Sequence, residues 1–347
     1  PEIKVVDIRE AYRKKRMRSH YSTALLDAVG QALALKEQVI LFQNRRGFSL
    51  FLECRECGWV PRCRHCDVSL TYHKQDKKMV CHYCGFSMPV AAVCSDCGSH
   101  ELLMKGFGTE KIEDEIALFF PGARIARLDL DAARSRHAYE KIITGFEKGN
   151  LDILVGTQMI SKGLDFENVS LVGILNADNM LNYPDFRAYE RSFQLMLQVS
   201  GRAGRKKRRG TVIIQARDNS MELFHHLIRN DFRTFALVQL AERKSFRYPP
   251  YTRLVEMVLK CSDRNVLDNG AGTLAGMLGH HAGLVVLGPE YPPVSRIKNH
   301  YVKRIILKVE RDKSLARMRE AIRKNVAQFQ AMPGFRSVTL TVDVDPA

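Results

Sequence analysis

The sequence predicts an α/β protein in which a mostly parallel sheet is interrupted by a cysteine-rich insertion and followed by a separate α+β domain. Three observations lead to this prediction. Short apolar segments alternate with helical segments over most of the first 245 residues, which is typical of parallel strands covered by helices. Eight cysteines interrupt this alternation between residues 53 and 100. The last hundred residues contain strands and helices in a different order.

The α/β part begins with a predicted helix over residues 22–35 and an apolar strand over residues 39–42. Beyond the cysteines the alternation resumes at Leu102. Further strands are predicted over residues 124–128, 152–155, 171–175 and 211–215, and further helices over residues 110–119, 137–147 and 189–199. Because the same rhythm stands on both sides of the cysteines, we expect one α/β domain made of residues 1–52 and 101–245, with residues 53–100 inserted into it.

The C-terminal part, residues 246–347, begins near the turn-forming sequence Tyr248-Pro249-Pro250. Its predicted strands cover residues 254–260, 283–287, 302–309 and 338–344, and its predicted helices cover residues 266–278 and 315–329. The order is therefore β-α-β-β-α-β, which favours a ferredoxin-like α+β sandwich.

The inserted cysteines form four CxxC pairs, which are Cys54/Cys57, Cys63/Cys66, Cys81/Cys84 and Cys94/Cys97. Each pair can give two thiolates to one tetrahedral ion, so eight cysteines suit two structural zinc ions. The gap between Cys66 and Cys81 is close to the usual zinc-ribbon spacing of about 15–20 residues, which favours a nested arrangement. One site would contain Cys63, Cys66, Cys81 and Cys84, and the other Cys54, Cys57, Cys94 and Cys97. Iron–sulfur clusters are the alternative, and the ninth cysteine, Cys261, is interpreted as a buried core thiol.

The chain is strongly basic, because 54 lysines and arginines against 38 aspartates and glutamates give a formal charge of +16. This excess favours a polyanionic partner, and nucleic acid is favoured over the alternative of an anionic membrane surface. Part of it lies in two clusters, Arg9–Arg18 and Arg202–Arg209, and the first of these can also be a solvated tail. The sequence has no apolar run of about 18 residues and no apolar leader at its start, so we expect no membrane association and a cytoplasmic location.

Two segments of the α/β part combine glycines with polar residues. The strand over residues 152–155 leads into Gly156-Thr157-Gln158, and its glycines allow the backbone to approach a phosphate closely. In Gln198–Arg205, Arg202 and Arg205 are three residues apart, so in a helix they can point at one target. Guanidinium groups suit a γ-phosphate, which makes this segment a candidate nucleotide contact.

Residues 156–166 and 198–205 resemble motifs V and VI of superfamily 2 helicases, and Phe42-Gln43-Asn44-Arg45-Arg46-Gly47 resembles motif IV. Three further features make the resemblance more specific. They are the four CxxC pairs between motifs IV and V, the segment Asn182–Arg191 and the closing Val342–Pro346. Over essentially its whole length the chain resembles the replication-restart DNA helicases. The resemblance implies a RecA-like second helicase lobe, the two zinc sites and a DNA-binding C-terminal domain.

The resemblance also implies an ATP-driven 3′-to-5′ DNA helicase that acts at stalled or abandoned forks and restarts replication through primosome assembly. Arg205 would be the arginine finger and Arg202 a second catalytic, phosphate-binding arginine, while Gly163 and Asp165 would face the nucleotide. The residues that would contact DNA are Arg45, Arg46, Thr157, Gln158 and Lys162. The implied cofactors are two zinc ions, with ATP and Mg²⁺ in the complete protein.

The implied partners are DNA forks, branches and single strands, the single-stranded-DNA-binding protein, and primosome or helicase-loading proteins, with the protein itself monomeric. The sequence contains no G-x-x-x-x-G-K-[ST] phosphate loop. We therefore expect the chain alone to be inactive as an ATPase. The alternative hypothesis is a non-enzymatic zinc module that binds DNA and docks partner proteins.

Overall fold

The computed structural model describes residues 1–44, 51–64, 68–73, 77–81, 84–105, 109–129, 132–133, 135–161, 166–204, 209–292, 295–297, 299–310 and 315–346. They belong to two compact units, and each is described by itself. The first unit contains residues 1–60 and 91–236, and the second contains residues 61–90 and 237–347.

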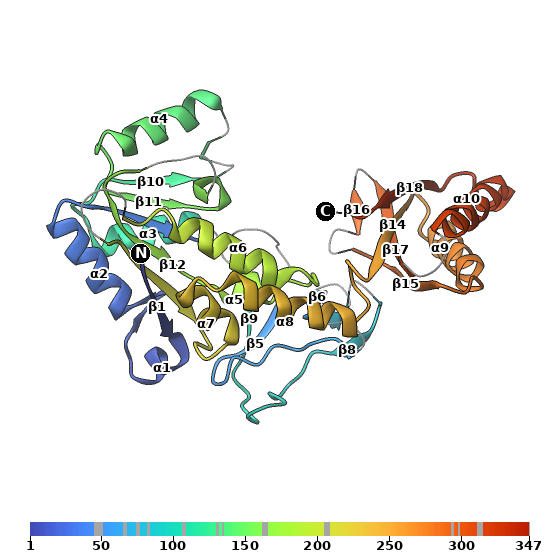
Figure 1. The fold of residues 1–347 in the computed structure, drawn as a ribbon, viewed down its shortest axis with the longest axis horizontal. Helices are drawn as coiled ribbons and strands as arrows, with labels where there is room; N and C mark the ends of the chain where they lie inside the picture. Colours follow the sequence, from blue (N-terminus) through green and yellow to red (C-terminus); the bar gives the residue numbers. More distant parts are fainter. Residues whose placement is uncertain are drawn as a thin grey trace. The chain divides into compact units, whose positions relative to one another are not determined.

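The first unit is built on a six-stranded sheet whose spatial order is β1-β13-β12-β4-β11-β10 (Figure 1). All neighbouring strands are parallel. The strands are β1 (Glu2–Asp7), β4 (Gln38–Phe42), β10 (Ile125–Leu128), β11 (Ile153–Gly156), β12 (Val169–Ile174) and β13 (Thr211–Ala216). The predicted fold class of this part is confirmed. Strand β1 was not predicted, because it is an edge strand of mixed sequence and has no apolar run.

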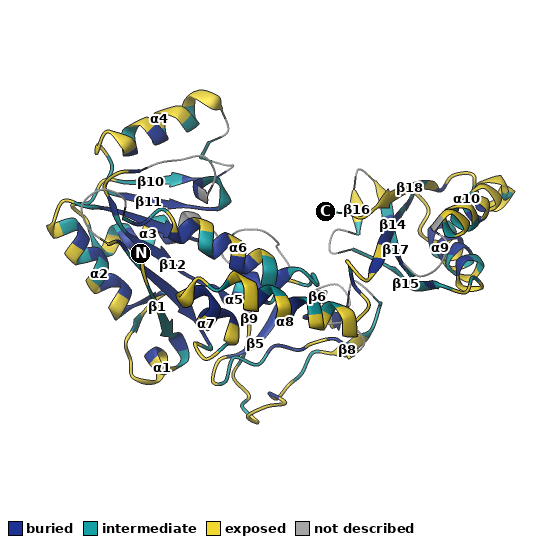
Figure 2. Cartoon of the chain, in the orientation of Figure 1, coloured by how far each residue is buried: buried dark blue, intermediate teal, exposed yellow. Residues whose placement is uncertain are grey.

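Helices cover both faces of this sheet, so alternate residues of a strand enter different cores. Val39 and Leu41 of β4 pack with helices α2 (Thr23–Ala34) and α3 (Thr109–Phe119). Ile40 and Phe42 belong to the opposite core, which contains side chains of five further helices. These are α4 (Arg136–Glu147), α5 (Asp178–Leu181), α6 (Ala188–Ser200), α7 (Glu222–Arg229) and α8 (Phe232–Ser245). Figure 2 shows the resulting pattern, with buried strands between helices that are exposed on their outer sides.

The first basic cluster lies in folded structure and not in a solvated tail. Arg9 and Arg13 belong to helix α1 (Ile8–Arg13), which Asp7 caps by accepting from the amides of Arg9 and Glu10. A short hairpin of β2 (Met17–Arg18) and β3 (Tyr21–Ser22) then leads into α2.

The chain enters the insertion through strand β5 (Phe51–Cys54) and leaves it through strand β9 (Leu102–Lys105). These two strands pair in antiparallel orientation. Within it, β6 (Thr71–His73), β7 (Lys78–Val80) and β8 (Ser87–Pro89) form a three-stranded antiparallel sheet. Residues 61–90, which include this small sheet, belong to the second compact unit. The domain boundaries expected from the sequence remain predictions.

The larger part of the second unit is a four-stranded antiparallel sheet of order β15-β17-β14-β18, with the short β16 added to β17. Two helices pack on one face through a core that includes Leu259, Leu274, Leu307 and Phe329. The elements are β14 (Thr252–Cys261), α9 (Arg264–Gly279), β15 (Leu284–Glu290), β16 (Arg296–Ile297), β17 (His300–Glu310), α10 (Leu315–Ala331) and β18 (Thr339–Val344). This order and topology confirm the predicted ferredoxin-like sandwich.

Helix α8 (Phe232–Ser245) contains the point at which the chain passes from the first unit to the second. Its Phe235 is buried in the first unit and stacks on Phe193 of α6, with ring centroids 4.4 Å apart. In the second unit, Cys261 is fully buried in the core, as the sequence predicted. Among the described residues, every helix is too short or too polar to cross a lipid bilayer.

Candidate functional site

Two of the predicted DNA-binding residues lie at the carboxyl edge of the parallel sheet. Strand β4 ends at Phe42 and strand β11 ends at Gly156, and the two strands are neighbours. The segments that follow them meet, because the Gln158 side chain donates to the Asn44 side chain at 3.4 Å. Thr157, next to Gln158, is 9% exposed. The carboxyl edge of an open α/β sheet is where such folds bind ligands. Arg45, Arg46 and Lys162 lie outside the described residues.

At Gly156 the structure leaves no room for a side chain. A Cβ atom there would lie 2.7 Å from the Leu128 carbonyl oxygen and would also collide with the Ile160 side chain. The protein itself therefore fills the space beside this glycine. Gly156 is therefore required by the close approach of β10 and of the turn at Ile160.

The arginine segment lies at the other end of the strands. Helix α6 ends at Ser200, and Arg202 stands in the turn beyond the cap Gly201, so the predicted helical presentation is wrong at Arg202. The turn is fixed by the Gly204 amide, which donates to the carbonyl of Val169, the first residue of β12, at 2.9 Å. Arg205 lies outside the described residues, as do Gly163 and Asp165.

A close backbone contact joins Gly210 to the turn at Ala203 and Gly204. A Cβ atom at Gly210 would lie 2.5 Å from the Gly204 nitrogen and from the Ala203 carbonyl carbon. Gly204 has a φ of +72°, which glycine adopts without strain. Gly210 immediately precedes β13, so this contact lies at the amino edge of the sheet.

The structure thus separates the predicted site residues into two groups. Thr157 and Gln158 lie at the carboxyl edge, whereas Arg202 follows α6 close to the amino edge. A six-residue strand such as β12 has a length of roughly 20 Å. One ligand of ordinary size does not contact both groups, which agrees with assigning them to different ligands.

The outer cysteine site consists of Cys54, Cys57, Cys94 and Cys97, whose sulfur atoms all lie within 4.8 Å of one another. The Cys54 and Cys97 sulfurs are 3.6 Å apart, and the Cys57 and Cys94 sulfurs are 3.4 Å apart. A tetrahedral site with Zn–S bonds near 2.3 Å has sulfur–sulfur edges of about 3.8 Å. The outer site therefore matches the geometry that a zinc ion requires.

The inner cysteine site brings together Cys63, Cys81 and Cys84, again with all sulfurs within 4.8 Å. The Cys63 and Cys84 sulfurs are 3.4 Å apart. The predicted fourth member, Cys66, lies outside the described residues. None of the described cysteines forms a disulfide, and the insertion contains two cysteine clusters that are compatible with zinc.

Three glycines complete these sites, and the sequence analysis did not single them out. Gly58, Gly85 and Gly98 each follow a CxxC pair and have φ values between 74° and 78°. In each case the glycine amide donates to the carbonyl of the first cysteine of its pair at 3.0 Å. The recurring CxxCG pattern is visible in the sequence and was the available signal.

The thiols of the outer site differ in acidity. Burial by itself raises the pKa of a thiol, but the amides of Cys97 and Asp96 donate to Cys94, and the pKa of Cys94 falls to about 7. At Cys57 burial prevails and raises the pKa. The pKa of Cys97 is also raised. A metal that binds here therefore displaces protons from thiols of unequal acidity.

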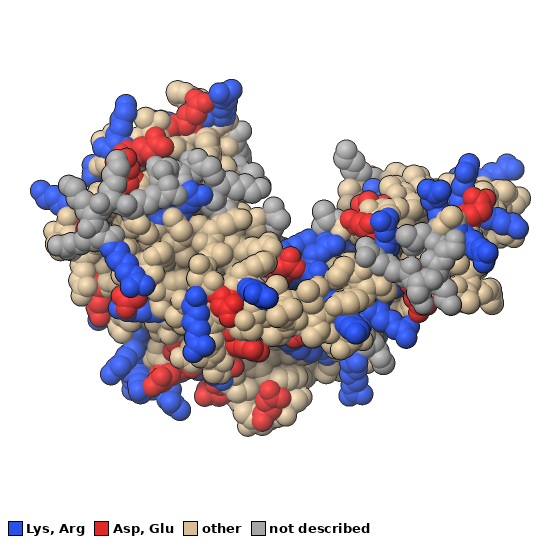
Figure 3. Space-filling model, viewed as in Figure 1, with Lys and Arg blue, Asp and Glu red and all other residues tan. Residues whose placement is uncertain are grey.

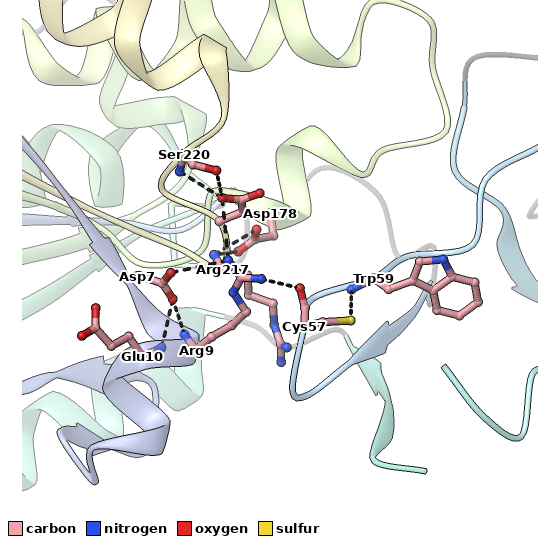
Figure 4. A network of polar contacts seen from close by, with 9 residues as sticks. Asp7, Arg9, Glu10, Cys57, Trp59, Asp178, Arg217 and Ser220 are labelled. Carbon is pink, nitrogen blue, oxygen red and sulfur yellow. Dashed lines mark hydrogen bonds and ion pairs between the residues drawn. The ribbon is translucent and has the colours of Figure 1, made fainter. Parts of the chain in front are cut away.

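A buried polar network joins the outer site to the sheet (Figure 4). Arg217, which directly follows β13, forms an ion pair with Glu53 and donates to the carbonyl of Cys54. Its own amide donates to the Asp178 carboxylate at 3.1 Å. Arg9 donates to the carbonyl of Cys57 at 2.7 Å. The sequence analysis missed Glu53, Asp178 and Arg217, because nothing local distinguishes them from surface charges, and it placed Arg9 only in a basic cluster.

The basic excess is distributed over the surface. In the view of Figure 3, lysine and arginine side chains occur on both units with acidic side chains between them. One exposed group lies on helix α10 and consists of Arg317, Arg319, Arg323 and Lys324. Clustered cations of this kind suit contacts with phosphate groups.

Three family profiles match the chain. The PriA DNA helicase Cys-rich region (CRR) domain matches residues 63–89, the helicase conserved C-terminal domain matches residues 108–207, and the primosomal protein N C-terminal domain matches residues 244–347.

Among curated proteins, the replication restart protein PriA of Bacillus subtilis (strain 168) is 38% identical over 348 residues, which are 100% of this chain and 43% of that protein. PriA of Treponema pallidum (strain Nichols) is 38% identical over 349 residues, which are 100% of this chain and 51% of that protein. The chain therefore spans about half the length of these relatives. Together with the parallel helicase sheet, the two cysteine clusters and the C-terminal sandwich, these matches show that the chain belongs to the PriA family.

Proposed function

We propose that this chain supplies the second motor lobe, the zinc-binding insert and the C-terminal DNA-binding domain of an ATP-driven 3′-to-5′ helicase that restarts stalled replication. The relatives are named replication restart proteins, and the helicase profile covers the segments that resemble motifs V and VI. The observation that carries the proposal is that Thr157 and Gln158 lie at one edge of the parallel sheet, whereas Arg202 lies near the opposite edge. It allows DNA and nucleotide to bind the same lobe at different places.

In this proposal the carboxyl edge binds the DNA backbone. Thr157, Gln158 and Asn44 present polar groups there, and Arg45, Arg46 and Lys162 add positive charge. The contacts are to phosphates, so binding depends on strand structure and not on base sequence. The exposed cations of α10 give the C-terminal domain its own contact with DNA.

The arginine segment at the amino edge binds the nucleotide in the cleft that this lobe forms with a first lobe. Arg202 and Arg205 contact the phosphates, and Gly163 and Asp165 face the same cleft. Arg205 acts as the arginine finger, because its charge stabilises the negative charge that develops on the transferred phosphoryl group. The phosphate loop and the Mg²⁺ ligands come from the first lobe.

The two cysteine clusters hold structural zinc. Four thiolates fill the tetrahedron, so no position remains open for catalysis. The ligands are Cys54, Cys57, Cys94 and Cys97 for the outer ion, and Cys63, Cys66, Cys81 and Cys84 for the inner ion. We further propose a cytoplasmic monomer whose protein partners are the single-stranded-DNA-binding protein and proteins that load the replicative helicase.

The experiment that tests the proposal measures ATP turnover and fork unwinding by a protein that contains this chain and a first motor lobe. We expect single-stranded DNA to stimulate turnover, and forks with a 3′-ended loading strand to be unwound in preference to forks with only a 5′-ended one. ATP turnover that is insensitive to DNA, or unwinding with the opposite polarity, contradicts the proposal.

A further inference from the structure

The outer cysteine site is attached to the helicase sheet through one buried arginine. Arg217 is 3% exposed, and Glu53, with which it forms an ion pair, is fully buried. A buried guanidinium is costly unless its charge and its donors are matched. Burial lowers the pKa of Arg217 to about 10, so the side chain keeps its charge at neutral pH.

The same arginine contacts the metal-binding turn itself. Its guanidinium donates to the Cys54 carbonyl, which also accepts the Gly58 amide at 3.0 Å and so closes the turn from Cys54 to Gly58. A Cβ atom at Gly58 would lie 3.2 Å from the Cβ and Cδ atoms of Arg217, so the turn packs directly on the aliphatic part of the arginine.

The sheet in turn fixes the position of the arginine. The Arg217 amide donates to both Asp178 carboxylate oxygens, at 3.2 and 3.1 Å, and Asp178 begins the helix that follows β12. Arg217 therefore joins the ends of β12 and β13 to β5 of the insertion. Arg9 donates a comparable hydrogen bond to the carbonyl of Cys57. Its side chain is 29% exposed, however, and also forms ion pairs with Asp7 and Asp218.

We infer that Arg217 is the positioning residue of the outer cysteine site, which holds the Cys54–Gly58 turn in its metal-binding shape and thereby sets the affinity of that site. Hydrogen-bond partners outside the ligand shell typically change metal affinity by roughly 10–100-fold when removed. Because coupling is reciprocal, metal in the outer site also stabilises the carboxyl edge of the sheet. The inner cysteines belong to the other compact unit, so their affinity is independent of Arg217.

The test uses the double variant Glu53→Met/Arg217→Met in the full chain. Replacing a buried ion pair by apolar side chains of similar size is usually tolerated, whereas removing one partner leaves the other charge buried and uncompensated. Arg253→Met, which removes an arginine of the second unit, is the control. Zinc content is measured first, and zinc affinity is then measured by equilibrium competition with a chelator. Trp59 is the only tryptophan, and its amide donates to the Cys57 sulfur, so its emission reports on the outer site.

We expect the double variant to keep its far-ultraviolet circular dichroism and to bind one of two zinc ions roughly 10–100-fold more weakly, with Trp59 emission following the weakened site. If the double variant loses its fold, Glu53→Gln replaces it, with a smaller shift at the same site. A folded variant that binds both ions with unchanged affinity, or binds both equally weakly, overturns the inference. The inference rests on the proposed zinc sites, and a wild-type chain with fewer than two zinc ions contradicts those sites separately.

Discussion

At the scale of single residues, the proposed ATPase role depends most directly on Arg205. In a protein with both motor lobes, Arg205→Ala should reduce DNA-stimulated ATP turnover by roughly 10³-fold or more, the scale known for arginine fingers. DNA binding should stay nearly unchanged, because the finger acts on charge that develops in the transition state. Arg202→Ala should mainly raise the KM for ATP. Steady-state kinetics check both, with the exposed Arg209 replaced by Ala as the control. Normal turnover by Arg205→Ala would show that the motif is wrongly assigned.

The substitution Gly210→Ala tests, at the scale of one residue, the close packing of Gly210 against Ala203 and Gly204. Gly210→Ala places a Cβ atom 2.5 Å from backbone atoms of Ala203 and Gly204, neither of which can move like a side chain. We expect the free energy of unfolding to fall by about 1–3 kcal/mol, as in overpacked cores. In Gly272→Ala the new Cβ meets nothing within 4 Å on helix α9, so this control should be neutral or stabilising. Urea denaturation distinguishes the two, and equal stabilities would contradict the packing at Gly210.

At the scale of elements, one ion pair fastens the start of β11 to the start of β10. Three bonds of 2.6–2.9 Å join Arg124 to Asp152, two from the Arg124 side chain and one from its amide. The pKa of Asp152 lies below its usual value, and the main cause is the hydrogen bond from the Arg124 side chain. The resulting stability is fully present above the unfolded pKa of about 3.9 and is lost as the pH falls through the lower folded value. The pair is partly exposed, so solvent screening keeps the effect small.

This linkage gives a prediction for Asp152→Asn. The variant should be less stable than the wild type at pH 7, and the difference should shrink as the pH falls below about 4. Urea denaturation at several pH values measures it, with Asp27→Asn on helix α2 as the control for loss of an exposed carboxylate. A stability difference that stays constant from pH 7 to pH 3 would exclude the ion pair as its cause.

The insertion is the element that should respond most to chelation. Without metal, the Cys54–Gly58 and Cys94–Gly98 turns lose what holds them together, so amides of residues 51–60 and 94–105 should exchange rapidly with deuterium. Through Arg217, amides near Asp178 should lose part of their protection. Strands β4 and β11 in the centre of the sheet should keep theirs, because their cores contain no cysteine ligand. Mass-spectrometric hydrogen exchange with and without chelator checks this, and uniform loss of protection across the chain would contradict it.

At the scale of the whole molecule, the formal charge of +16 should control affinity for DNA. Neutralised phosphates release counterions, so a protein with about 6–10 phosphate contacts loses roughly 10³–10⁵ in affinity when salt rises from about 50 to 200 mM. We expect a steep loss of this kind for forks and single strands, and little dependence on base sequence. Fluorescence anisotropy across a salt series measures it. Equal affinity at low and high salt would exclude phosphate contacts as the source of binding.

The sequence by itself determined the order of the main elements, the class of each part of the fold and the grouping of most of the cysteines. These properties are local. Apolar periodicity fixes strands and helices, and CxxC spacing fixes which thiols can reach one another. The edge strand β1 was missed because it lies against one neighbour only and needs no apolar run.

Tertiary structure alone decided how the site residues are distributed. Thr157 and Arg202 both stand in segments that combine glycines with polar residues. Thr157 nevertheless lies at the carboxyl edge of the sheet, whereas Arg202 lies near the amino edge. Gly156 and Gly210 face protein backbone, which no sequence pattern shows. Arg217 and Glu53 are 164 positions apart and read as ordinary charges in the sequence. Their buried pairing exists because chain folding brings distant segments into one low-dielectric place, and only there does a charge require one particular partner.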